Sequence, residues 1–255
     1  MKLSVVIPAR DEEGSIEQTV DEIVKTLMEE RIPFEIVVVD DGSADRTAAH
    51  VRQLMERCPD VRLVRNTGRH GFGMAVRAGL AHAAGEAVTV MMADGSDSPE
   101  DLVRYYRKIE EGYDCAFGSR FIRGSKILDY PVHKLAINRM ANWFIRMLFG
   151  LRYNDITNAF KCYRRQAIDG MQPLISPHFN LTVEMPLKAI VRGYSYAVLP
   201  ISWANRKSGV SKLRIKEMGS RYLFIVLHVW LEHHLSRGDY LRGEEAEERA
   251  ATRHA

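Results

Sequence analysis

The sequence predicts an α/β fold with a mostly parallel sheet and flanking helices. Two observations lead to this prediction. Apolar runs bounded by turn residues alternate with stretches of helical length, and the runs are continuously hydrophobic, which is typical of strands buried on both faces. Alternating strands and helices favour parallel strands joined by right-handed crossovers. Because such sheets bind ligands beyond the carboxyl ends of their strands, a site is expected in the loops that leave the strands.

The first half of the chain carries the clearest elements. We expect strands at 3–9, 34–39, 61–64 and 87–92, the first two rich in Val and Ile. Helices are expected at 15–30, 45–57 and 74–84, where apolar residues recur every three to four positions. The clearest such set is Ile16, Val20, Ile23, Val24 and Leu27.

Past residue 120 the alternation weakens. We expect helices at 133–149 and 182–191, a short segment at 155–163 and a strand at 194–203. Residues 1–217 contain no stretch rich in Pro, Gly and Ser that would indicate a linker, and they are predicted to form one domain. An amphipathic or packing helix is expected to follow at 218–235. The apolar run at 222–231 is shorter than the roughly 20 residues that a bilayer-spanning helix needs. The charged tail, 236–255, is expected to be disordered.

Composition limits the class of protein. With 255 residues, 46% hydrophobic and 27% charged, the chain is neither disordered nor collagenous. Its three cysteines lie too far apart for a zinc ribbon or a disulfide framework, and we interpret them as small buried hydrophobes in a reducing compartment. The first residues enter a strand-like run without the features of a secretory signal, so a cytoplasmic location is expected.

The charge is distributed unevenly. Residues 1–118 hold 14 Lys and Arg against 22 Asp and Glu, a net charge of −8, whereas the remainder holds 22 against 11, or +11. An acidic half joined to a basic half suits a protein that holds a metal ion on one side and anionic groups on the other. Solvated helix faces of mixed sign are the alternative. The basic residues are not interleaved with aromatics, so no nucleic-acid partner is expected.

Carboxylates follow two of the expected strands. Asp40 and Asp41 end the second strand before a Gly-Ser turn, where repulsion must be offset by a metal ion, by the donors of a ribose and base, or by backbone amides of the turn. Asp94 follows the fourth strand and precedes further oxygen ligands, an arrangement that suits Mg²⁺ or Mn²⁺ bridging substrate phosphates. A simple helix start explains residues 98–100 but leaves Asp94 unexplained. Near the first strand, Glu12 could accept from a nucleobase, while Asp11 and Glu13 also suit a helix N-terminus.

Glycine and basic residues mark possible anion sites. The loop 66–73 lacks the spacing of a nicotinamide-binding or P-loop motif but can offer backbone N–H groups to an anion. Arginine forks match phosphate oxygens, and the segment 206–212 could close over an anion as a mobile loop. For Arg139 and Lys207 a merely solvated surface is the alternative. The basic set consists of Arg120, Lys134, Asn138, Arg139 and residues 205–212.

Together these segments resemble the family 2 glycosyltransferases, and within them the dolichyl- or polyprenyl-phosphate mannosyltransferases. The likeness runs from residue 3 to 212 and rests on the order and spacing of the motifs, since no single one suffices. They are Val-Ile-Pro at 6–8, Val-Asp-Asp-Gly-Ser at 39–43, Asn66 with Gly71 and Gly73, Ala93-Asp94, Gly118-Ser119-Arg120, Asp155-Ile-Thr-Asn-Ala-Phe-Lys161, and Arg206-x-x-Gly-x-Ser-Lys212.

The resemblance implies the GT-A nucleotide-diphosphosugar transferase fold, a nucleotide sugar donor such as GDP-mannose, Mg²⁺ or Mn²⁺, and an isoprenoid phosphate acceptor. It assigns nucleotide binding to Pro8, Ala9, Glu12, Asp40, Asp41, Gly71 and Asp94, and the metal to Asp94, Ser96 and Asp97. It assigns the acceptor phosphate to Arg120, Lys134, Asn138, Arg206 and Lys212. The expected catalytic residues are Asp94, Arg120, Arg206 and Lys212.

One position departs from the family pattern. The family usually shows Asp-x-Asp after the fourth strand, and here the first position is Met92. Either Asp94 with Ser96, Asp97 or waters suffices for the metal, or metal binding is weak. Met92 also permits a catalytically silent nucleotide-binding scaffold. Among enzymes, the alternative is transfer of glucose or another sugar from a UDP-sugar to a lipid phosphate or other acceptor.

A lipid acceptor requires access to a membrane. We expect peripheral attachment to the cytoplasmic face through residues 218–235, beside Lys212, Arg214, Lys216 and Arg221, or attachment through a membrane-embedded partner subunit. The alternative for 218–235 is an ordinary helix that packs on the domain.

Overall fold

The computed structural model describes residues 1–128, 130–204 and 215–242. Its centre is a seven-stranded sheet with the order β3-β2-β1-β4-β7-β5-β8. β7 runs antiparallel to both neighbours and the other pairings are parallel, which confirms the mostly parallel sheet predicted from the sequence. The strands are β1 (Leu3–Ala9), β2 (Phe34–Asp40), β3 (Val61–Arg65), β4 (Ala87–Val90), β5 (Cys115–Ser119), β7 (Lys161–Arg164) and β8 (Tyr196–Pro200).

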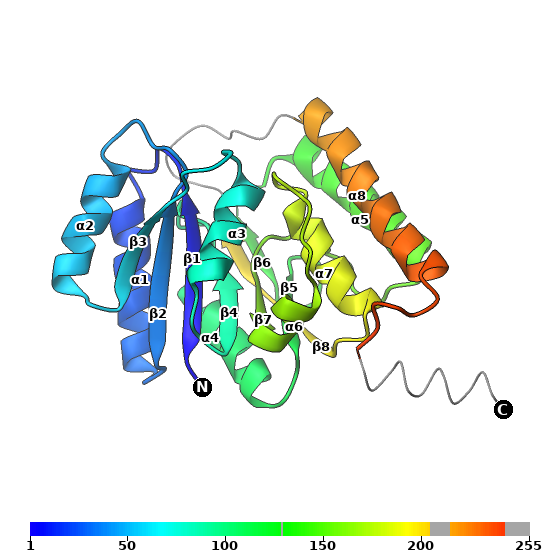
Figure 1. Cartoon of the computed structure of the whole chain (residues 1–255), viewed down its shortest axis with the longest axis horizontal. Helices are drawn as coiled ribbons and strands as arrows, with labels where there is room; N and C mark the ends of the chain where they lie inside the picture. The colour runs from blue at the N-terminus through cyan, green and yellow to red at the C-terminus, as the bar shows by residue number, and fades with distance from the viewer. Residues whose placement is uncertain (129, 205–214, 243–255) are drawn as a thin grey trace.

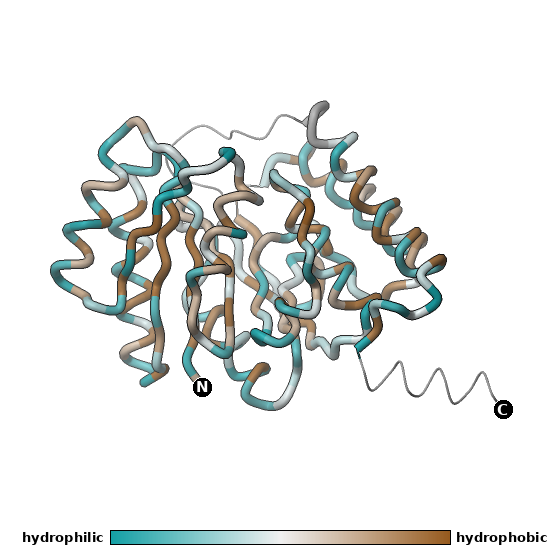
Figure 2. The backbone as a smooth tube through the Cα atoms, viewed as in Figure 1, coloured by the Kyte–Doolittle hydropathy of each residue, from teal (hydrophilic) through white to brown (hydrophobic). Residues whose placement is uncertain are grey.

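Helices cover both faces of the sheet (Figure 1). On one face pack α1 (Ile16–Glu29), α2 (Thr47–Arg57) and α4 (Pro99–Glu110), and on the other pack α3 (Phe72–His82), α6 (Arg165–Gly170) and α7 (Leu181–Val191). Successive residues of β1 point to opposite faces, so Val5 and Ile7 join one core while Val6 joins the other. Figure 2 shows strands β1 and β2 among the most hydrophobic parts of the backbone.

Two long helices lie side by side at the end of the molecule away from β3 (Figure 1). They are α5 (Val132–Phe149) and α8 (Ile215–Leu235), and α8 also packs on α7. The C-terminal end of α8 is fastened to the domain by Glu232, which pairs with buried Arg192 at 2.8 Å. Just beyond the helix, Arg242 pairs with Asp114 at 3.0 Å.

The strand expected at 194–203 is two strands in different sheets. β8 pairs with β5 as far as Ser119, where β5 ends. The chain then changes partner, and β9 (Ser202–Ala204) pairs in parallel with β6 (Lys126–Leu128). The Ser202 N–H donates to Asp101 Oδ2 at 2.6 Å, which holds β9 against α4.

The other sequence predictions agree within a few residues. The four expected strands of the first half and the three helices between them are present, as are α5, α7 and α8. Ser98 caps α4 by accepting from the Asp101 N–H, and Pro99 is its first residue, so residues 98–100 do start a helix. All three cysteines are free, with Cys115 and Cys162 buried and Cys58 half-buried.

The glycine-rich loop packs tightly on a later segment of the chain. The Met74 N–H donates to Pro177 O at 3.3 Å, and the rings of Phe72 and Phe179 stack with centroids 4.2 Å apart. A Cβ on Gly73 would lie 2.3 Å from Ser176 O. A Cβ on Gly71 would likewise lie 2.5 Å from Pro177 O. The absence of side chains at Gly71 and Gly73 therefore permits the backbone of residues 176–177 to approach the loop closely.

A buried ion pair holds that segment from the other side. Glu184 accepts from the N–H groups of Ile175 and Ser176, both at 2.8 Å, and pairs with Lys188 at 2.9 Å. Both side chains of the pair are at most 1% exposed. The segment 175–179 is thus fixed between α7 and the start of α3.

We expect Gly73→Ala to destabilise the protein by about 1–3 kcal/mol, because the added methyl group clashes with backbone atoms that cannot move independently. Gly219→Ala is the matched control, since a Cβ there meets nothing within 4 Å and alanine favours the α8 helix by up to about 1 kcal/mol. Urea unfolding of the two variants measures the difference. Equal midpoints would show that the close approach is not rigid.

Candidate active site

A cleft of about 1150 Å³ opens at the carboxyl ends of the parallel strands. β1 ends there with Pro8 and Ala9, and Asp41 follows β2. Met92 follows β4 and Arg120 follows β5. The opposite wall comes from α5 and α8. The cleft therefore lies at the edge of the sheet where the sequence predicted a site.

The structure brings most of the predicted site residues into this one cleft. Those lining it are Pro8, Ala9, Glu12, Asp41, Gly71, Asp94, Ser96, Asp97, Arg120, Lys134 and Asn138. Asp40 does not line it. Two predicted residues, Arg206 and Lys212, lie outside the described residues.

The two adjacent carboxylates at the end of β2 have different surroundings. Asp40 accepts from the Ser43 N–H at 2.9 Å, so it stabilises its own turn. Asp41 accepts from Asn66 Nδ2 at 2.6 Å and from the Gly71 N–H at 2.8 Å, and His70 Nδ1 lies 3.2 Å away. Hydrogen-bond donors of the protein thus offset the repulsion between the two carboxylates, which agrees with the alternative that backbone amides of the turn do so.

One N–H group of the glycine-rich loop already has a partner within the protein. The Gly71 N–H donates to Asp41 at 2.8 Å. The physical reason is proximity, because β2 and the loop after β3 leave neighbouring parallel strands at the same edge. Gly71 contributes to the cleft as a wall residue.

The turn after β4 holds Asp94 and Asp97 close together. The Ser96 N–H donates to Asp94 Oδ1 at 3.1 Å, and the Met92 N–H donates to Asp97 Oδ2 at 3.0 Å. Asp97 is 7% exposed. Burial raises the pKa of its carboxyl to about 7, and the negative charge of Asp94 acts in the same direction.

This turn offers the donor set of a hard divalent ion. The two carboxylates and the hydroxyl of Ser96 line the cleft together, and Mg²⁺ typically takes one or two carboxylates and completes its shell with water and substrate phosphates. A cation would also offset the repulsion between Asp94 and Asp97. In the described part of the chain, no three His, Cys, Asp or Glu residues are placed to hold a metal by themselves. The residues therefore fit an ion that shares its shell with a phosphorylated substrate.

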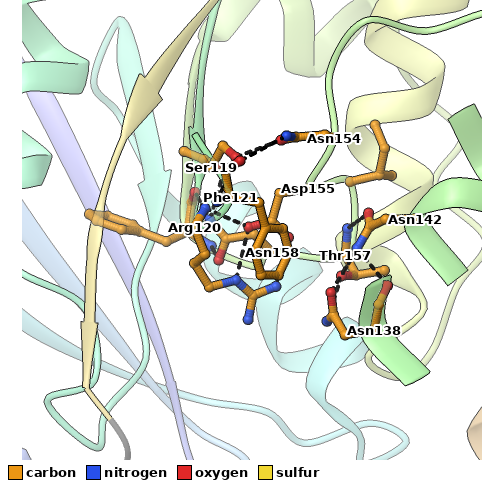
Figure 3. A network of polar contacts seen from close by, with 12 residues as sticks. Ser119, Arg120, Phe121, Asn138, Asn142, Asn154, Asp155, Thr157 and Asn158 are labelled. Atoms are coloured by element: carbon orange, nitrogen blue, oxygen red, sulfur yellow. Dashed lines mark hydrogen bonds and ion pairs between the residues drawn. The ribbon is translucent and has the colours of Figure 1, made fainter. Parts of the chain in front are cut away.

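Arg120 is held by a buried ion pair (Figure 3). Its Nε and Nη2 donate to the two oxygens of Asp155 at 2.8 and 2.7 Å, and its backbone N–H donates to the same carboxylate at 2.8 Å. Although burial opposes the charge, Asp155 raises the pKa of the guanidinium above its usual value. Arg120 thus presents a permanent, oriented positive charge at the cleft.

Lys161 lies beneath the segment that carries Asp155. The side chain is 1% exposed, and its Nζ donates to Ile156 O at 3.0 Å and to the carbonyl of Asn158. Burial lowers the pKa of the ammonium to about 7, with Asp155 opposing the shift. The motif at 155–161 entered the sequence interpretation only as part of a resemblance, and the structure gives it a physical role in shaping the cleft.

The wall formed by α5 and α8 includes an apolar part. Ile137, Phe144 and Ile145 contribute from α5, and Leu223 and Val226 from α8. The lining of one cleft thus includes carboxylates, the positive charge of Arg120 and apolar side chains.

Sequence reasoning missed several lining residues. They are Tyr130, Thr157, His178, Phe179, Trp203 and Tyr222. His178 and Phe179 follow no strand, so their place depends on the packing of 175–179 against α3 and carries no sequence signal. Thr157 lies inside the motif 155–161, so the sequence did carry a signal for this residue.

Comparison with known proteins accounts for this arrangement. Residues 4–170 match the family model described as Glycosyl transferase family 2. The chain belongs to this family. The resemblance seen in the sequence is therefore confirmed for the family, and this glycosyl transferase family 2 protein is an enzyme of the glycosyltransferase class.

Relatives of this family 2 member have informative names. It is 33% identical over 184 residues to the polyprenol monophosphomannose synthase of Mycolicibacterium smegmatis, covering 70% of this chain and 69% of that protein. It is 32% identical over 220 residues to the dolichol-phosphate mannosyltransferase of Pyrococcus furiosus, covering 85% of this chain and 60% of that protein. It is 27% identical over 219 residues to the undecaprenyl-phosphate mannosyltransferase of Micrococcus luteus, covering 84% and 88%.

Solved structures confirm the GT-A fold of this family 2 member. The glucosyl-3-phosphoglycerate synthase of Mycobacterium tuberculosis, in complex with Mn²⁺, UDP and glucosyl-3-phosphoglycerate, superposes with a TM-score of 0.67 at 19% identity. The match covers 91% of this chain and 79% of that one. The same synthase was also crystallised with Mg²⁺ and UDP, with a TM-score of 0.65 at 18% identity.

The raised pKa of Asp97 predicts a pH-dependent stability. The folded state favours the protonated carboxyl, so this stabilisation is complete below the ordinary pKa of 3.8 and is lost as the pH rises through about 7. Asp97→Asn keeps a neutral acceptor for the Met92 N–H. In metal-free buffer, we expect the unfolding free energy of wild type to fall by up to ~4 kcal/mol relative to that of this variant as the pH rises from 3.8 to about 7.

Urea unfolding at pH 4.5, 5.5, 6.5 and 7.5, roughly spanning the titration, measures the difference. Asp60→Asn, at an exposed turn position, is the control and should follow wild type. If Asp97→Asn also follows wild type, Asp97 is ionised in the folded protein throughout.

Proposed function

We propose that this protein transfers mannose, with inversion, from a nucleotide sugar such as GDP-mannose to a polyprenyl or dolichyl phosphate. The observation that carries the proposal is that one cleft joins carboxylates suited to a metal–diphosphate, cations suited to a second phosphate, and an apolar wall suited to an isoprenoid chain. The names of the relatives support the same donor sugar and acceptor class.

The donor would occupy the acidic end. Pro8, Ala9, Glu12 and Asp41 border the space proposed for the base and ribose, and Gly71 closes it. Asp94, with Ser96 and Asp97, would hold Mg²⁺ or Mn²⁺. When bound, the ion supplies positive charge that stabilises a nucleoside diphosphate as leaving group.

The acceptor phosphate would lie at the basic end. It is already an anionic nucleophile, so the reaction needs no strong general base. Arg120 and Lys134 line the cleft there and would place the phosphate oxygen for attack on the anomeric carbon as the bond to the diphosphate breaks. Arg206 and Lys212, outside the described residues, are proposed to add charge at the same end. Asn138 also lines the cleft at this end, and its side chain bonds Thr157 and Asn142.

We propose peripheral attachment at the cytoplasmic side through an apolar face on α5 and α8. The face consists of Met140, Trp143, Met147, Phe224, Leu227, Leu231 and Leu235, all 42% exposed or more. Their spacing of three and four places each set on one side of its helix. Basic residues on the same helices, among them Arg139 and Arg146, suit anionic headgroups. Among the described residues, no helix has the length and apolarity needed to cross a bilayer. Attachment through a membrane-embedded partner subunit is the other route.

Met92 favours a second candidate, a catalytically silent nucleotide-binding scaffold. It lines the cleft where the family usually has a carboxylate. Such a scaffold would bind nucleotide sugar and transfer nothing.

An assay of sugar transfer separates these candidates. With Mn²⁺ or Mg²⁺ and polyprenyl phosphate in vesicles, we expect transfer of radiolabelled mannose from GDP-mannose and much less glucose from UDP-glucose. Asp94→Ala should lower kcat at least about 100-fold, because a proposed ligand of the metal ion is lost. Asp60→Ala, an exposed residue remote from the cleft, is the control.

Thermal melting of both variants verifies that they fold. Transfer of glucose alone would replace the donor in this proposal, and nucleotide binding without any transfer would establish the scaffold. Unchanged turnover by Asp94→Ala would remove this residue from the site.

Flotation with anionic liposomes tests the apolar face. We expect wild type to float, and the double variant Trp143→Glu and Phe224→Glu to remain in the soluble fraction, because charges on the face oppose burial in lipid. Met28→Glu is the matched control, since Met28 is 65% exposed but lies on α1. Wild-type protein that stays wholly soluble would refute direct lipid contact.

A further inference from the structure

A polar network joins α5 to the segment 155–161 (Figure 3). Asn142 Nδ2 donates to Asn138 Oδ1 at 2.7 Å and to Thr157 Oγ1 at 3.0 Å. Asn138 Nδ2 donates to the same hydroxyl at 2.9 Å, and the Thr157 N–H donates to Asn142 Oδ1 at 3.3 Å. Asn142 is 2% exposed. The amide is therefore satisfied by this network.

Burying an apolar residue at position 142 would cost less free energy than burying the amide of asparagine. Burying an amide costs free energy unless each polar group finds a partner, and such networks gain specificity when all partners are present. Ile145, on the same side of α5, shows that this interface otherwise uses hydrophobic contacts. The asparagines thus fix α5 in one position relative to Thr157.

The same segment orients Arg120. Asp155 lies two residues before Thr157 and receives three hydrogen bonds from Arg120. Lys161 fixes the backbone on either side of Thr157 through the carbonyls of Ile156 and Asn158. A displacement of Thr157 would therefore move Asp155 and, through it, the guanidinium of Arg120.

We propose that Asn142 and Thr157 are positioning residues that tie α5 to the segment aiming Arg120 at the acceptor phosphate. The proposal rests on the proposed function for the identity of the acceptor. The outer side of α5 carries part of the apolar face, so the helix that meets the lipid surface also sets the cation that meets the lipid phosphate. Neither positioning residue needs to touch the substrate.

Thr157→Val is the decisive variant, because valine has the shape of threonine without the hydroxyl. Thr157→Ser keeps the hydroxyl and is its matched control. We expect Thr157→Val to lower kcat/KM for vesicle-borne polyprenyl phosphate about tenfold, as expected for losing hydrogen bonds worth roughly 1.4 kcal/mol. The KM for GDP-mannose and flotation with liposomes should stay within about twofold of wild type, and Thr157→Ser should resemble wild type.

Asn142→Leu extends the test. We expect the same loss of kcat/KM for the acceptor, and the double variant with Thr157→Val should be no worse than either single variant, because both remove one connection. Additive losses would contradict a shared connection. Losses that affect donor and acceptor equally and follow the melting temperature would show a purely structural role and overturn the proposal.

A readout independent of activity separates this inference from the proposed function. The Arg120 N–H donates to Asp155, so its hydrogen exchange reports whether the ion pair stays in place. We expect faster exchange in Thr157→Val than in Thr157→Ser, measured by NMR. If wild type transfers no sugar but this difference is found, the proposed function fails and the positioning role stands. Equal exchange in the two variants overturns the positioning role.

Discussion

The Arg120–Asp155 ion pair is the interaction on which the basic side of the cleft depends. Both side chains are buried, so each charge relies on the other, and removing one partner of such a pair generally costs about 3–5 kcal/mol. Arg120 follows β5 and Asp155 precedes β7, so the pair also fixes how two neighbouring strands meet the cleft. Two hydrogen bonds from the guanidinium and one from the backbone N–H leave the side chain one orientation, which suits recognition of a phosphate.

Strand order explains why acidic and basic groups meet. β7 runs antiparallel between β4 and β5, so the segment before it arrives at the edge where those two strands end. Asp97 after β4, Asp155 before β7 and Arg120 after β5 are thereby neighbours although they are far apart in sequence. Four carboxylates of the first half, together with Arg120 and Lys134 of the second, thus line one cleft. Charges of both signs suit the two anionic substrates proposed for it.

The sequence predicted those parts of the structure that local chemistry determines. The hydrophobic runs gave the parallel strands, and carboxylates directly after strands pointed to the acidic side of the cleft. It could not separate Asp40 from Asp41, because which carboxylate faces the cleft depends on the loop after β3. Nor could it show that Gly71 and Gly73 admit residues 175–179, or that β9 leaves the main sheet, since both depend on long-range packing. The roles of Lys161 and Asn142 are clear only from their buried partners.

Attachment of α8 at both ends has a mechanical consequence. Glu232 and Arg242 are tied to Arg192 and Asp114 at the far end. Near the cleft, the Tyr222 O–H donates to Phe179 O at 3.2 Å, and the Phe179 ring stacks on Phe72 of α3. The apolar side of the cleft therefore has a width that is set by the folded domain before any ligand enters, because α8 cannot tilt without breaking contacts at one end or the other.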